Sequence, residues 1–288
     1  LSCTLQAEKY DTVSPNGKLK IKLKIDNGTQ YEVWYDNTQL ILPSPIGLHL
    51  ADGRVIGNGS VKSAKKRKVN QTIDVLVGKN KELQDTYNEL TVSFNDSCDL
   101  VVRAYDEGVA YHFATRLNGE ITIISEDAIF NFTSTPTIYY PECDANYSGE
   151  TDQSGRTHQV HQGYRNFERL YKVYKGPLEI PYERFAVSPV LYEYPDSPYK
   201  VVVTESNTYD YPALYMESNG YNSMRGKWAN YPKETIDSDP SNPYYWYSNH
   251  LVVTRENYIA KTDGNRSFPW RVIIVSEDDK SLLNNELV

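Results

Sequence analysis

The sequence predicts an all-β protein, built as one large antiparallel sandwich of two sheets. Residues 18–25 (KLKIKLKI) alternate strictly between lysine and apolar side chains, which is typical of a half-buried strand. The segments that follow are joined by short connections rich in Gly, Asn and Asp, and such connections favour antiparallel pairing. No stretch shows sustained apolar periodicity of the helical kind, so about a dozen or more strands are expected over 288 residues.

The first strands form a meander. Residues 30–35 return from the turn after residue 25, and residues 38–42 continue the sheet. The two prolines in residues 43–48 predict a rigid corner that closes the meander. Residues 51–70 are rich in Gly, Asn and Lys and are expected to form a loop, in which the basic run at residues 62–68 is solvated.

Further strands are interrupted by two irregular stretches. Residues 134–186 are expected to make a long excursion from the sheet, with a short strand or helical turn near residues 166–174, and residues 217–245 are expected to be irregular. Ser276 and the acidic residues after it resemble the N-cap of a short helix with Leu282, Leu283 and Leu287 on one side. The remaining strands are expected at residues 89–94, 100–105, 109–113, 120–124, 128–132, 138–140, 189–192, 198–204, 246–254 and 270–276.

Composition limits the kinds of molecule that the protein is expected to bind. The net charge of −8 argues against nucleic acid, because binding to phosphates rests on Lys and Arg. No run of 18 apolar residues occurs, so no transmembrane segment is expected. The 25 tyrosines suit carbohydrate binding, but they are equally typical of the core and rim of a β protein.

The N-terminus indicates export. Residues 1–7 (LSCTLQA) are read as the remnant or tail of a signal peptide, with lipidation of Cys3 as the alternative, and residues 8–288 as one domain. In that domain Cys98 and Cys143 could form a disulfide with each other or remain two separate thiols. They do not have the spacing of metal ligands.

Residues 200–216 hold the first candidate for chemistry. Three consecutive valines predict a strand buried on both faces, and Glu205 follows where that strand should end. A carboxylate beside polar residues could bind a hard cation or a sugar hydroxyl. The alternative is an ordinary surface glutamate at a strand end.

Two other groups are weaker candidates. His158 and His161 lie in the long excursion and could ligate a metal or move protons, although solvated histidines give the same pattern. The aromatic run at residues 244–247 (YYWY) could stack on sugar rings, but strand alternation would turn half of it toward a core.

Six segments follow one another along the chain: residues 14–19 (SPNGKL), 43–48 (PSPIGL), 87–92 (YNELTV), 103–113 (RAYDEGVAYHF), 205–211 (ESNTYDY) and 269–276 (PWRVIIVS). Taken together in this order, they resemble the N-terminal domain of glycoside hydrolase family 97. The resemblance implies a large β-supersandwich similar to that of galactose mutarotases, packed on a catalytic (β/α)8 barrel that would follow residue 288. It also implies a calcium-dependent α-glucosidase or α-galactosidase acting on α-linked oligosaccharides, located in the periplasm or at the outer membrane of a Gram-negative bacterium.

The same resemblance implies a role for Glu205. The family pattern His-Glu-Ala-x-Leu-x-Asp-Tyr matches here at Glu205, Asp210 and Tyr211 and departs at its His, Ala and Leu positions. Glu205 is therefore expected to be a calcium ligand lent to the active site of the barrel, while the catalytic groups lie in the barrel. Within this chain Glu205 is expected at a sheet edge, with few partners, facing the barrel.

Two rival functions stay open from the residues alone. A free-standing carbohydrate-binding sandwich would present an exposed aromatic platform such as residues 244–247. A mutarotase-like enzyme would need His158 or His161 and a carboxylate in one cleft. The sugar preference and the stereochemical course of the reaction are not determined by these residues.

Overall fold

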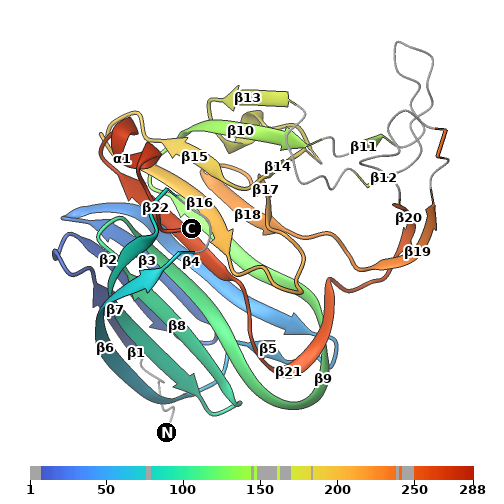
Figure 1. Ribbon diagram of the computed structural model, residues 1–288, viewed down its shortest axis with the longest axis horizontal. Helices are drawn as coiled ribbons and strands as arrows, with labels where there is room; N and C mark the ends of the chain where they lie inside the picture. The colour runs from blue at the N-terminus through green and yellow to red at the C-terminus, as the bar shows by residue number, and fades with distance from the viewer. Residues whose placement is uncertain are drawn as a thin grey trace, which may run out of the picture.

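The computed structural model describes residues 8–75, 79–143, 146–147, 161–162, 170–182, 184–237, 240–241 and 250–288. It is almost entirely β-structure, and every strand pair is antiparallel (Figure 1). The first half of the chain contains β1 Glu8–Val13, β2 Leu19–Ile25, β3 Thr29–Tyr35, β4 Thr38–Leu50, β5 Val55–Ile56, β6 Val61–Asp74, β7 Glu82–Phe94, β8 Cys98–Ala104, β9 Gly108–Phe132, β10 Thr137–Cys143 and β11 Asn146–Tyr147.

The second half continues in the same way and ends in one short helix. A 3₁₀ turn, η1 Pro177–Glu179, interrupts the strands. The elements are β12 His161–Gln162, β13 Leu170–Tyr174, β14 Phe185–Val187, β15 Val190–Glu193, β16 Lys200–Ser206, β17 Tyr215–Ser218, β18 Ser223–Lys227, β19 Pro232–Asp237, β20 His250–Arg255, β21 Ala260–Ser267, β22 Trp270–Ser276 and α1 Asp279–Leu283.

The strands lie in two facing layers. The first layer runs β6–β7–β8–β9–β22–β16–β15–β10–β13. The second layer runs β1–β2–β3–β4–β9–β18–β17–β14. A single large apolar core fills the space between them, built from alternate residues of both layers.

The expected separation into two sheets is wrong, because hydrogen bonds join eighteen strands into one continuous sheet. The 25-residue strand β9 pairs with β8 and β22 at its start and with β4 and β18 at its end, so it belongs to both layers. Gly119, with φ 75°, and Gly264 on the neighbouring β21 lie where the register shifts and the two strands bend. Residues 109–113, 120–124 and 128–132, expected as separate strands, belong to the one strand β9.

Three further expectations about local structure are wrong. Residues 51–70 include β6, a long strand at the edge of the first layer, rather than only loop. The prolines of residues 43–48 lie inside β4, which continues past them with a shifted register instead of turning a corner. Residues 217–245 contain β18, β19 and the last two residues of β17.

The C-terminal helix is confirmed. Asp278 caps it by accepting a 2.8 Å hydrogen bond from the Ser281 amide, which satisfies one of the free donors of the first turn. Leu282 and Leu287 pack on the outer side of the first layer, against an apolar cluster formed by Ala110, Val272 and Ile274. Leu283 is exposed, so the expected apolar side of this segment contains two of the three leucines.

The two cysteines lie apart. Cys98 belongs to the main core, whereas Cys143 lies in a smaller cluster with Phe185 and Tyr215, so they do not pair with each other.

Candidate functional site

Glu205 lies near the end of β16, directly opposite Arg271 on β22. The valines before it obey the expected pattern, since Val201 and Val203 enter the main core while Val202 packs against the outer cluster. Glu205 follows on the core-facing side, and its side chain is 8% exposed. The expectation that it has few partners is wrong, because Arg271 and the Leu214 amide both donate to its carboxylate. β15 pairs with β16 only as far as Val203, so at Glu205 the described ladder continues on the β22 side alone.

A buried ion-pair network holds the Glu205 carboxylate. Its Oε2 accepts a 2.7 Å hydrogen bond from Nη1 of Arg271, and its Oε1 accepts one of 2.7 Å from the Leu214 amide. Arg271 also donates from Nε and Nη2 to the two carboxylate oxygens of Glu126 on β9, both at 2.7 Å. The guanidinium thereby connects β9, β16 and β22, with a bidentate contact to Glu126 and a single contact to Glu205.

Aromatic side chains close this network off from water. The Arg271 guanidinium lies 5.1 Å from the ring centre of Trp228 and 5.9 Å from that of Tyr211. The Tyr211 hydroxyl donates a 3.3 Å hydrogen bond to Glu126. Only 1% of the Arg271 side chain and 4% of the Glu126 side chain are exposed. Such enclosure strengthens each charge–charge contact and makes each of them costly to break.

The network contains one more carboxylate than cation. Burial raises the pKa of the Glu205 carboxyl above its usual value and outweighs the opposing effect of Arg271. Burial alone would lower the pKa of Arg271, but the carboxylates of Glu126 and Glu205 reverse this and hold it above its usual value. The guanidinium therefore stays charged, and the excess negative charge lies on the two glutamates.

The loop after β16 is fixed by a second arginine. Asn207 and Asp210 adopt left-handed backbone angles, with φ 58° and 50°, which Asn and Asp tolerate better than most residues. Arg266 on β21 donates 3.1 Å hydrogen bonds to the carbonyl oxygens of Tyr209 and Asp210. The loop from residue 207 to residue 214 is thus held at one end by Arg266 and at the other by Glu205.

Sequence reasoning missed Arg271 and Glu126 as partners of Glu205. A usable signal existed for Arg271, since it is the only charged residue within the strand at residues 270–276, which was otherwise predicted to be apolar. Glu126 carried no such signal, because it lies in a polar part of β9 and meets Arg271 only through the fold.

The structure does not describe the side chains of the other candidate residues. His158 and residues 244–247 lie outside the described residues. His161 is placed only by its backbone, which pairs with Tyr147 in the small β11–β12 sheet. Neither the imidazole–carboxylate cleft nor the exposed aromatic platform of the rival functions is seen in the described part of the chain.

Calcium could be bound here only as a shared site. A carboxylate is the right donor for Ca²⁺, and each oxygen of Glu205 keeps a second lone pair beside the hydrogen bond that it accepts. The nearby guanidinium opposes a divalent cation, while Glu126 offsets that charge. Among the described residues, no group of three or more His, Cys, Asp or Glu could hold a metal. Most ligands of such a site would have to come from elsewhere.

Comparison with solved structures identifies the class of fold. A glycoside hydrolase family 97 enzyme from Pseudoalteromonas sp. strain K8, solved in complex with acarbose, superposes with a TM-score of 0.68 at 17% identity, covering 96% of this chain and 38% of that one. A β-arabinopyranosidase structure superposes with a TM-score of 0.65 at 16% identity, covering 93% of this chain and 40% of that one. These likenesses show the fold.

Sequence comparison gives the family. The family model described as glycosyl-hydrolase 97 N-terminal matches residues 12–288, so the chain belongs to this family, as its resemblance predicted. A retaining α-galactosidase of Bacteroides thetaiotaomicron (strain VPI-5482) is 31% identical over 290 residues, which cover 99% of this chain and 42% of the relative. The chain therefore spans less than half the length of the relatives that it matches.

Proposed function

We propose that this chain is the N-terminal domain of an exported α-glycosidase, in which it packs on a catalytic domain and lends the Glu205 carboxylate to a calcium site. The match of residues 12–288 to the glycosyl-hydrolase 97 N-terminal family carries this proposal. The relative named as a retaining α-galactosidase makes α-galactosides the first substrates to test, with α-glucosides second. Within the described residues no helix is long and apolar enough to cross a membrane.

The residues of this chain would act by orientation rather than by chemistry on the sugar. Arg271 and the Leu214 amide fix both carboxylate oxygens of Glu205. The Glu205 side chain therefore has little rotamer freedom left to lose when it binds a cation. Calcium, when bound, would supply positive charge beside the substrate. The catalytic acid and base or nucleophile would come from the other domain, so we expect the chain alone to hydrolyse no aryl α-glycoside.

Calcium titration of the full-length protein tests the role of Glu205. We expect Glu205→Gln to weaken calcium binding at least tenfold by isothermal titration calorimetry, because a neutral amide oxygen attracts a divalent cation less strongly than a carboxylate does. Glu120→Gln serves as control, since Glu120 is an exposed partner of Lys261 on the surface. Equal calcium affinity of the Glu205→Gln protein and the unmodified protein would exclude Glu205 as a ligand.

Hydrolysis and location are tested separately. Release of nitrophenol from aryl α-galactoside and aryl α-glucoside by the full-length protein measures activity and sugar preference. Fractionation of expressing cells measures export, which rests on the interpretation of residues 1–7 as signal-peptide remnant. Absence of activity toward both substrates would contradict the proposed class of enzyme.

A further inference from the structure

The loop between β13 and β14 passes from the last strand of the first layer to the last strand of the second. Ile180 in this loop is 6% exposed and belongs to the main core. The Ser218 hydroxyl at the end of β17 donates a 2.7 Å hydrogen bond to the carbonyl oxygen of Pro177 in η1. Because burial and this hydrogen bond anchor the loop, its outer surface is a fixed part of the fold.

A pocket of about 310 Å³ lies between this loop and the strands β17 and β18. Met216 and Met224 point into the main core, so alternation turns Glu217 and Arg225 to the outer side, where they line the pocket. Small-molecule sites in proteins occupy about 300–1,000 Å³. This pocket lies at the lower end of that range, which suits a ligand built on one ring.

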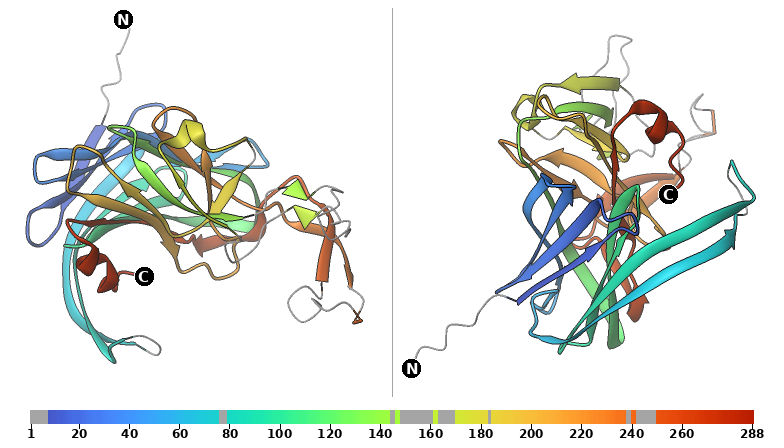
Figure 2. Two further views of the ribbon diagram at one scale, coloured as in Figure 1. Left: turned by 90° about the horizontal axis from the view of Figure 1, so that it is seen from above. Right: turned by 90° about the vertical axis from the view of Figure 1, so that its left-hand side faces the viewer.

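The pocket is separate from the site around Glu205. Glu205 lies on the core-facing side of the first layer, whereas Glu217 lies on the outer side of the second layer. In the left view of Figure 2 the yellow η1 turn lies on the side of the body opposite the C-terminus, which packs on the first layer. The pocket therefore opens on a different side of the molecule from the C-terminal helix.

Positive charge is in excess at the pocket. The Glu217 carboxylate accepts hydrogen bonds of 2.8 Å from Nε of Arg225 and 2.7 Å from Nζ of Lys227. Arg184, which also lines the pocket, has its Nη1 3.6 Å from Oε1 of Glu142. The described side chains thus supply three cations against two carboxylates, although acidic residues outnumber basic ones by 38 to 30 in the whole chain.

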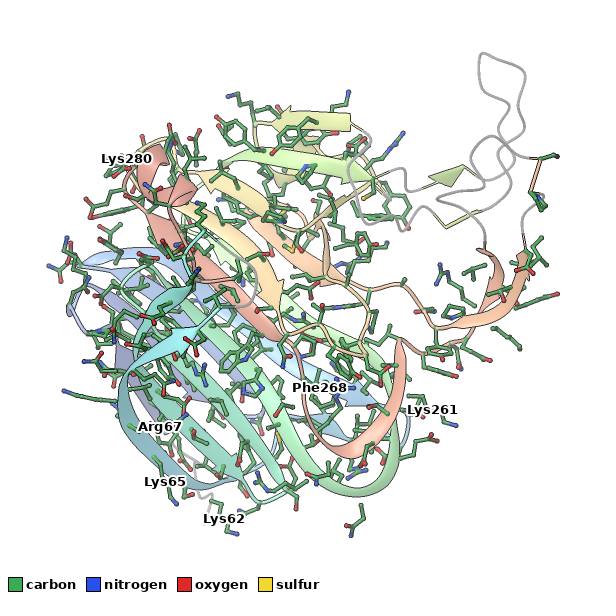
Figure 3. All side chains as sticks on the ribbon, in the orientation of Figure 1. Lys62, Lys65, Arg67, Lys261, Phe268 and Lys280 are labelled. Atoms are coloured by element: carbon green, nitrogen blue, oxygen red, sulfur yellow. The ribbon has the colours of Figure 1, made fainter. Side chains whose placement is uncertain are left out.

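This group of cations is distinct from the basic run on β6. Figure 3 shows Lys62, Lys65 and Arg67 at the lower left of the molecule, whereas β17 and β18 lie in the upper half of the same view in Figure 1. The cations of β6 therefore do not contribute to the pocket.

Two guanidinium groups keep hydrogen-bond donors for a ligand. Among the described residues Arg225 is engaged only through Nε, so both of its Nη groups are available, and its side chain is 50% exposed. The 3.6 Å separation from Glu142 is too long for a hydrogen bond from Arg184, whose side chain is 42% exposed. A planar guanidinium matches the two oxygens of a carboxylate, which makes a carboxylate the preferred occupant.

The loop side of the pocket is apolar and aromatic. Tyr182 is 92% exposed and Leu178 is 69% exposed, although the loop that carries them is anchored. An aromatic ring offers a flat apolar face together with a polar hydroxyl, which suits the C–H face and the hydroxyls of a sugar ring. The pocket thus combines cations on the strand side with an apolar surface on the loop side.

We propose that this pocket binds a carboxylate-bearing sugar, with its carboxylate between Arg184 and Arg225 and its ring against Tyr182. The single positive charge in excess matches a carboxylate better than a phosphate monoester, which carries about −1.5 to −2 at pH 7. The choice of a sugar as the body of this acid rests on the proposed function, since a protein that acts on saccharides meets them as ligands. The site binds the sugar without acting on it, because its cations are placed to hold a carboxylate.

Calorimetric titration of the full-length protein with galacturonate and with its methyl ester tests the proposal. We expect galacturonate to bind about tenfold more tightly than the ester, which has the same ring without the charge. Arg225→Gln should abolish this preference, while Lys227 still pairs with Glu217. Arg54→Gln is the matched control, since Arg54 is 47% exposed and pairs with the exposed Asp52.

A second variant tests the contact with the ring. Tyr182→Ala should weaken the binding of galacturonate and of the ester alike by about threefold, because both present the same ring. Tyr221→Ala is its control, since Tyr221 is 82% exposed in the turn between β17 and β18. Tyr182 is almost fully exposed, so its loss should leave the unfolding midpoint unchanged.

Each outcome decides the proposal. A preference for galacturonate that Arg225→Gln removes and Arg54→Gln retains supports it. Equal affinity for the acid and the ester overturns it, as does unchanged binding in both Arg225→Gln and Tyr182→Ala. Inorganic phosphate that displaces galacturonate at equal concentration overturns the assignment to a sugar acid. Glu205→Gln should bind galacturonate like the unmodified protein, so the calcium site can fail while this pocket stands, and a loss of binding in that variant overturns the pocket.

Discussion

Replacing Arg271 with methionine should destabilise the domain more than almost any other single substitution of a charged residue. Methionine has a similar length and fits the space between Trp228 and Tyr211, so little volume is lost. Loss of the guanidinium charge leaves the carboxylates of Glu126 and Glu205 buried close to each other without a cation. The Tyr211 hydroxyl and the Leu214 amide remain as their hydrogen-bond donors.

The size of the effect follows from this burial. Removing one partner of a buried ion pair costs about 3–5 kcal/mol, because the charge that remains is neither paired nor solvated. A loss of about 4 kcal/mol lowers the midpoint of thermal unfolding by roughly 10 °C for a chain of this size. Exposed ion pairs are worth roughly 0–1 kcal/mol. Arg54→Met, which removes the partner of the exposed Asp52, should therefore shift the midpoint by no more than about 2 °C.

Urea unfolding followed by circular dichroism measures the difference. The triple variant Arg271→Met, Glu126→Gln, Glu205→Gln should recover more than half of the lost stability, because the two amides need no counter-charge. A loss below about 1 kcal/mol for Arg271→Met, or no recovery in the triple variant, would refute the assignment of a tightly coupled buried network.

Two further predictions concern the first layer. Burial favours a raised pKa for Glu89, but hydrogen bonds from Arg67 and Arg103 outweigh it and hold the pKa below its usual value. A carboxyl group whose pKa is lower in the folded state stabilises the fold at any pH above its unfolded pKa of about 4.3 and loses this effect as the pH falls. The difference in unfolding free energy between Glu89→Gln and the unmodified protein should therefore be complete at pH 7 and smaller at pH 3.5 in urea unfolding. An equal difference at both pH values would contradict this. Gly108→Ala should cost about 1–3 kcal/mol, because a Cβ there would lie 2.6 Å from Leu287 and 2.8 Å from the backbone of Ile273. An unchanged unfolding midpoint would show that the C-terminal segment does not pack against β9.

Alternation and turn residues predicted the strands that have one solvated face. In β2 the lysines lie outward and the apolar residues inward, as their spacing indicated. β6 could not be found in this way, because both of its faces are largely exposed and no apolar alternation remains. Its strand conformation depends on pairing with β7, and its lysines suit an edge that should not recruit another strand.

The candidate site was found only in part. Glu205 and its place at the end of a buried strand follow from the local pattern and the family motif. Its partner Arg271 is 66 residues away in the sequence, and Glu126, the other partner of Arg271, is 145 residues away from Arg271. No local pattern encodes which buried charges meet, because the pairing depends on the register of β22 against both β9 and β16.

The sequence by itself therefore determined the all-β class, the family, most strand positions and the place of Glu205 near the end of a buried strand. These depend on local periodicity and on the order of motifs along the chain. Tertiary structure decided that the two layers form one sheet, joined through β9 and through the pairing of β10 with β14, and that Glu205 is held by Arg271 and the Leu214 amide. These properties depend on contacts between distant segments, where burial and charge pairing outweigh local preference.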